Sequence, residues 1–142
     1  MTQAQKVGYL RVALWVFGLI FIFGVYPMMM WIWPSGWGWE PRQPEYEYMI
    51  MGIYGVLGVF LIRAAKNPTA HLSLIWFTIW SSIVHAGIML IEAVVDPHEL
   101  INIPGDIAAL FLVAVVLWVL MPDRQESMEE VLAPAKGGQV NT

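Results

Sequence analysis

Four long apolar stretches constrain the fold of this chain more than any other feature. They are residues 9–33, 47–63, 69–95 and 100–121. Each is about as long as the roughly 17–25 residues that an α-helix needs to cross a bilayer. Hydrophobic residues make up 58% of the sequence, more than in ordinary soluble domains. We therefore predict one all-α domain, residues 1–122, that forms an integral membrane four-helix up-down bundle. Residues 123–142 are predicted to form a flexible cytoplasmic tail.

The basic residues predict how this bundle is oriented. Of the seven Lys and Arg residues, only Arg42 falls in the predicted loops on one side of the four stretches, and the others fall on the opposite side. Because cytoplasmic loops are enriched in Lys and Arg, we predict that both termini are cytoplasmic. So few basic residues also argue against a nucleic-acid partner. The absence of cysteine excludes disulfides and thiolate metal sites.

The third stretch carries a polar face inside an apolar helix. A step of seven residues, two helical turns, connects most of its polar side chains. The residues of this face are His71, Thr78, Ser81, Ser82, His85, Glu92 and Glu99. A charge near the bilayer centre costs at least about 2.5 kcal/mol, so the face should turn toward other helices or a cavity.

Two interpretations of His85 and Glu92 remain open at this point. They could relay protons or bind a polar ligand, because ionisable groups inside a span are often functional. Alternatively, hydrogen bonds to serines, to Tyr54 or to a backbone carbonyl could simply fix the helix register. On the predicted outer rim, Asp106 joins the polar candidates.

Metal and haem sites are weaker interpretations. His71 and His85 have the spacing with which one helix of the cytochrome b family ligates two haems. Such a site also needs a second helix with two matching histidines. This chain has only one further histidine, His98, so a second copy of the chain would have to supply them. Asp96, His98 and Glu99 are weak candidate ligands for a divalent cation, since helix capping already accounts for Asp96 and Glu99.

Glycine and proline predict where helices approach and bend. Gly52, Gly55 and Gly58 form a flat shoulder on the second stretch, and we expect the polar face of the third stretch to pack there. Pro27 lies inside the first stretch, where it removes one backbone donor and predicts a kink.

Four segments together resemble a family of small bacterial membrane proteins of unknown function. They are Trp-Pro-Ser-Gly-Trp at 33–37, the glycine-rich run at 52–61, the long third stretch at 67–89 and Pro-Gly-Asp-Ile-Ala-Ala-Leu at 104–110. The similarity covers about residues 16–122. It implies four transmembrane helices in a bacterial cytoplasmic (inner) membrane, no particular activity, and a stronger case for His71, His85 and Asp106 than for Glu92.

The function expected from these patterns is non-enzymatic. The polar face and an aromatic, acidic mouth favour binding of a lipophilic ligand with a polar head, such as a quinone or a lipid, or an accessory role in a larger membrane complex. One alternative is a redox protein that ligates haem or a pigment through His85 and His71. Another is a proton-coupled transporter that acts as a homo-oligomer.

Overall fold

The computed structural model describes residues 1–34 and 43–122, and all regular structure in these ranges is helical. The prediction of four apolar helices is confirmed, because four helices are long and apolar enough to cross a membrane. They are Gln3–Ile32, Pro44–Ala65, Pro68–Val95 and Pro97–Leu120. The predicted tail, residues 123–142, and most of the aromatic loop around Arg42 lie outside the described residues.

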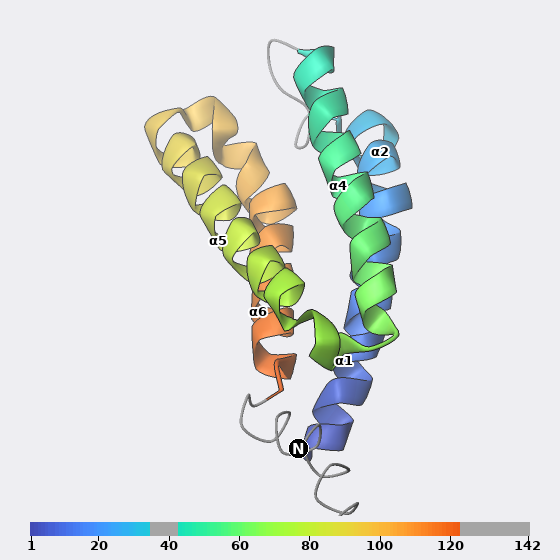
Figure 1. The fold of residues 1–142 in the computed structure, drawn as a ribbon. Coiled ribbons are helices and arrows are strands. Elements are labelled where there is room, and N and C mark those ends of the chain that lie inside the picture. Colours follow the sequence, from blue (N-terminus) through green and yellow to red (C-terminus); the bar gives the residue numbers. More distant parts are fainter. Residues whose placement is uncertain (35–42, 123–142) are drawn as a thin grey trace, which may run out of the picture.

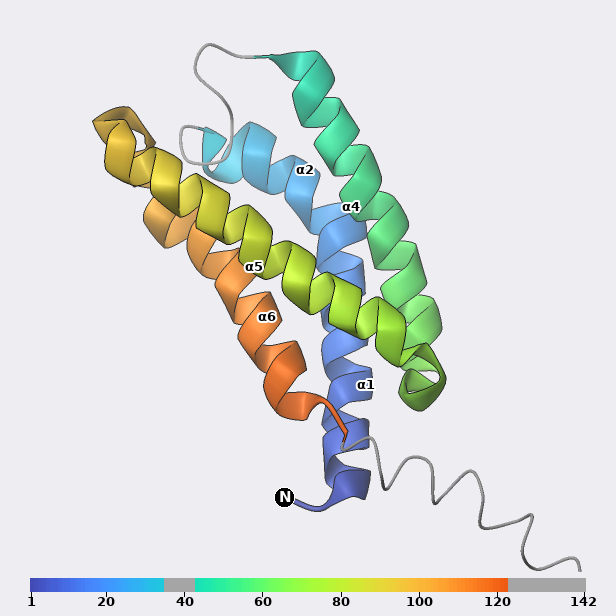
Figure 2. The ribbon, with the colours of Figure 1, turned by 60° about the vertical axis from the view of Figure 1, so that its left-hand side comes forward.

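The first of these helices bends near Pro27. It consists of α1 (Gln3–Leu19), a π-helical segment η1 (Ile20–Gly24), a short α2 (Val25–Pro27) and a second π-helical segment η2 (Met28–Ile32). Wide π turns on both sides of a proline are a recognised cause of helix bending. Figure 2 shows α2 leaning away from the axis of α1, as the sequence predicts.

α4 (Pro44–Ala65) lies beside α1, and two glycines allow the close approach (Figure 1). A Cβ atom on Gly58 would lie 2.6 Å from the carbonyl oxygen of Gly18, and one on Gly18 would lie 2.8 Å from that of Gly58. A Cβ atom on Gly52 or Gly55 would meet nothing within 4 Å. The expectation that this shoulder packs on the third helix is therefore wrong, since Gly58 packs on the first.

The second pair of helices contains α5 (Leu72–Val95) and α6 (Ala108–Leu120), which lie side by side. A 3-10 turn, η3 (Pro68–His71), leads into α5. Between α5 and α6 the chain forms a 3-10 segment, η4 (Pro97–Asn102), and a π-helical segment, η5 (Ile103–Ile107). Gly105 has φ −95° and ψ −110°, which are not helical angles, so the fourth helix is broken there.

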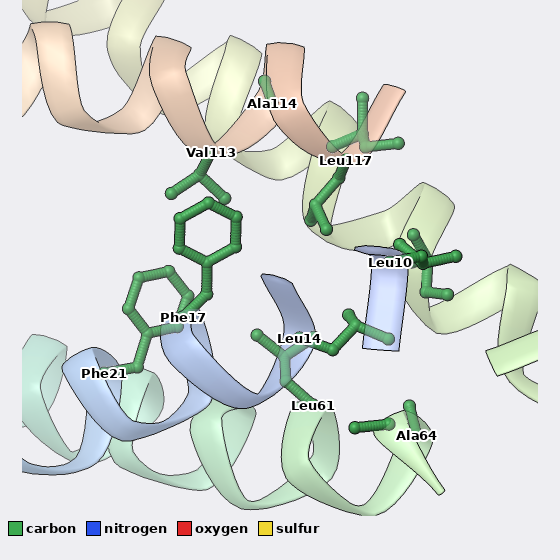
Figure 3. Packing of buried hydrophobic residues seen from close by; sticks show 12 residues of the cluster. Leu10, Leu14, Phe17, Phe21, Leu61, Ala64, Val113, Ala114 and Leu117 are labelled. Carbon is green, nitrogen blue, oxygen red and sulfur yellow. The ribbon is translucent and has the colours of Figure 1, made fainter. Parts of the chain in front are cut away.

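The main hydrophobic core joins both pairs at one end of the molecule. Figure 3 shows Phe17 and Phe21 of the first helix facing Val113 of α6, and Leu14 near Leu61 of α4. This end carries the basic residues Lys6, Arg63 and Lys66, and we call it the cationic end. The opposite end carries Glu45, Glu47, Asp96 and Glu99, and we call it the acidic end. Toward the acidic end α4 and α5 move apart in both Figure 1 and Figure 2.

Candidate functional site

A cavity of about 830 Å³ lies between the two helix pairs in the half of the molecule nearer the acidic end. The residues that line it show this position, because they come from the first half of α4 and the second half of α5. Apolar side chains form most of the wall: Phe17, Ile20, Phe21, Val25, Met29, Ile50, Ile88, Met89, Ile91, Val95, Ala109, Leu110, Leu112 and Val113. A cavity of this size and character is typical of sites for small organic ligands.

A hydrogen-bonded pair, Tyr54 and His85, marks the deep end of the cavity. The Tyr54 hydroxyl lies 2.9 Å from Nδ1 of His85, and their rings stack with centroids 6.2 Å apart. The ring of Phe21 meets that of Tyr54 edge-on at 4.9 Å, which fixes the tyrosine from the other side. Tyr54 lies ten residues after the start of α4, or about 15 Å along it, about half of a hydrocarbon layer of roughly 30 Å.

Beyond this pair the cavity is closed. Phe17 and Val113 line its deepest part, and both also belong to the core cluster shown in Figure 3. Leu14 and Leu117 follow toward the cationic end, and each is fully buried. Among the described residues, the cavity is therefore closed toward the cationic end.

The Tyr54–His85 pair can present both a donor and an acceptor to a ligand. In one tautomer the tyrosine hydroxyl donates to Nδ1 and Nε2 carries the proton; in the other Nδ1 donates to the hydroxyl oxygen and Nε2 accepts. Among the described residues Nε2 has no hydrogen-bond partner. The pair can thus form a hydrogen bond with a carbonyl, hydroxyl or ammonium group of a ligand.

Carboxylates surround the rest of the cavity. Those in its lining are Glu47, Glu92, Asp96, Glu99 and Asp106. Asp96 accepts from the backbone N–H of His98 at 2.9 Å, Asp106 from that of Ile107 at 3.0 Å, and Glu99 from the side-chain amide of Asn102, so these three carboxylates also hold local structure. No Lys or Arg among the described residues lines this cavity.

The structure brings together one part of the predicted site. Tyr54, His85, Glu92 and Asp106 all line the cavity, although they come from three different helices. The seven-residue step from His85 to Glu92 follows the wall of the cavity toward its mouth. Glu99 of the predicted polar face and Asp96, both also considered above as weak metal ligands, line the mouth as well.

The remaining members of the polar face lie elsewhere. Thr78 and Ser82 are buried, and the Thr78 hydroxyl donates to the carbonyl oxygen of Leu74 at 2.9 Å. Ser81 donates in turn to the carbonyl oxygen of Thr78 at 3.2 Å. Such bonds satisfy hydroxyls within their own helix, so they need no ligand.

The histidines do not converge. His71 belongs to η3 at the cationic end, about 21 Å along the helix from His85, and it does not line the cavity; nor does the exposed His98. Within one copy of the chain the cavity therefore offers a single imidazole, which does not fit the donor set of a bis-histidine haem. In the described ranges, no three His, Asp or Glu side chains are grouped so that they could hold a metal ion.

Glu47 belongs to the acidic outer rim, and it is not among the candidate ligand-binding residues predicted from the sequence. It is only 2% exposed and lines the cavity on α4. A signal was present, because Glu47 and Tyr54 are seven residues apart, the same step that connects His85 and Glu92. Two facing helices therefore each carry a polar pair with the same spacing.

Comparison with known proteins identifies the family of the chain. Residues 4–130 match the model of a family of unknown function (DUF6632), so the chain belongs to that family. No curated protein and no solved structure matches it.

Proposed function

We propose that this protein is a non-enzymatic, multi-pass protein of the bacterial cytoplasmic membrane that binds a lipophilic ligand with a polar head. The ligand occupies the cavity between the α1–α4 pair and the α5–α6 pair. The observation that carries this proposal is the combination of apolar walls, the half-buried Tyr54–His85 pair and a polar mouth in one cavity of about 830 Å³. An apolar space with a few polar groups is what a ligand with a tail and a head requires.

The proposed orientation rests on the distribution of charge. Lys6, Arg63 and Lys66 at the cationic end favour the cytoplasmic side, and the acidic residues favour the outer side. In this arrangement the four helices form an up-down bundle with both termini inside. The cavity then opens in the outer half of the membrane, where a lipophilic molecule arrives from the bilayer or from the outer surface.

The proposal is tested by extracting ligands from the purified protein and identifying them by mass spectrometry. Ala109 lines the cavity, so Ala109→Trp should fill it and remove the co-purified compound. Val115 lies on the exposed side of the same helix and provides a matched control, because Val115→Trp leaves the cavity unchanged. We expect a compound in the wild type and in Val115→Trp that is absent in Ala109→Trp.

Two outcomes contradict the proposal. Equal amounts of every extracted lipid in all three proteins would show that the cavity holds no ligand of its own. A Soret absorption band that disappears in His85→Ala would instead indicate the redox alternative, with His85 as an axial ligand.

A further inference from the structure

The charge of the cavity lining is one-sided. Five carboxylates, one imidazole and one phenol are its ionisable groups among the described residues, and no Lys or Arg accompanies them. The described basic side chains at the cationic end lie beyond the closed core. A ligand that enters this cavity therefore meets a negative potential, strengthened by low-dielectric walls.

The carboxylates are spread around the cavity and do not converge on one point. Glu47 lies on α4, Glu92 near the end of α5, and Glu99 and Asp106 on the two segments that lead to α6. A compact metal ion needs several oxygen ligands at about 2.0–2.6 Å, and no group of three candidate ligands occurs in the described ranges. A diffuse negative lining suits a larger, weakly hydrated organic cation.

From this lining we propose that the ligand is a monocationic amphiphile, with an ammonium-type head between Glu92 and Asp106 and an apolar tail along the wall formed by Phe21, Leu110 and Val113. This inference rests on the proposed function and adds the charge of the ligand to it. An anionic amphiphile would bring like charges together. A neutral one would gain no charge-assisted contact with Glu92 or Asp106.

The test compares three probes that share one dodecyl chain. Dodecyltrimethylammonium, dodecanol and laurate, each radiolabelled, are titrated into full-length protein in phosphatidylcholine nanodiscs, with empty nanodiscs as the blank. We expect saturable binding of the cation and at least about tenfold weaker binding of the other two, since a charge-assisted contact contributes about one to two powers of ten in affinity.

Variants then locate the binding site. Glu92→Gln and Asp106→Asn should each weaken binding of the cation by about ten- to a hundredfold. Glu45→Gln is the matched control, because Glu45 is exposed on the first turn of α4 and does not line the cavity. If Asp106→Asn disturbs the break at Gly105, Glu92→Gln carries the test alone, since the Glu92 carboxylate has no structural hydrogen bond among the described residues.

The outcomes separate this inference from the proposed function. If laurate or dodecanol binds as tightly as the cation, or if Glu92→Gln retains wild-type affinity, the inference is overturned. The proposed function survives that result provided that Ala109→Trp still removes the binding. If no probe depends on Ala109, both are overturned.

Discussion

The hydrogen bond between Tyr54 and His85 directly connects the two helix pairs. It joins the middle of α4 to the middle of α5. In water such a bond competes with solvent, whereas at the centre of a membrane protein its competitors are other protein groups. Its strength therefore contributes to how firmly the cavity is held in shape.

A double-mutant cycle measures this contribution. We expect Tyr54→Phe and His85→Leu to show a coupling free energy of about 0.6 kcal/mol, and at most about 1.7 kcal/mol, as for other hydrogen bonds between membrane helices. The measurement is the free energy of unfolding in mixed micelles. Tyr48→Phe, on the exposed side of α4, is the control and should not couple to His85→Leu. Additive effects of Tyr54→Phe and His85→Leu would contradict the observed bond.

At this scale the sequence predicts which side of a helix is polar, but not which polar residues meet. The seven-residue step correctly brings His85 and Glu92 to one wall, because periodicity fixes a direction around the helix axis. Thr78 shares that direction but lies deeper, where the helices are in contact, and it bonds to Leu74 instead. Whether a polar residue lines the cavity or is buried between helices depends on where along their length the two helices diverge. The periodic pattern of a single helix does not contain that information.

Among the helices, the contact of Gly18 with Gly58 decides which elements pair. The absence of side chains at both positions lets the backbones of α1 and α4 approach, and close approach is a main source of helix association in membranes. The glycine pattern on α4 could be recognised from the sequence. Its partner could not, because the two glycines of α1, Gly8 and Gly18, lie ten residues apart and form no repeating pattern.

Substitution of these glycines tests the pairing. Gly58→Ala should destabilise the protein by about 1–3 kcal/mol, because its Cβ would lie 2.6 Å from a backbone oxygen that cannot move independently. Gly52→Ala, on the same helix, places its Cβ in open space and should leave the free energy of unfolding nearly unchanged or raised. Unfolding in mixed micelles again provides the measurement. Equal effects of the two substitutions would contradict the packing described here.

For the whole molecule, the separation of charge between its ends predicts its topology. The chain has no cysteine, so each introduced cysteine is the sole target of a thiol reagent. In spheroplasts, a membrane-impermeant maleimide should label Glu45→Cys and His98→Cys directly. It should label Thr2→Cys and Lys66→Cys only after the membrane is opened. The reverse pattern would invert the proposed orientation, and labelling of Thr2 and Lys66 on different sides would exclude an up-down bundle.

The closed end of the cavity limits what one copy of the chain can do. Phe17 and Val113 line the cavity on the side of the cationic end, and beyond them the main core joins both helix pairs through fully buried side chains such as Leu10, Leu14 and Leu117. Passage to the other side would require these side chains to separate against the hydrophobic contacts that hold both helix pairs together. Under the proposed function and orientation, the described part of one copy can therefore retain a guest or exchange it with the outer leaflet, whereas transfer to the other side of the membrane requires this core to open.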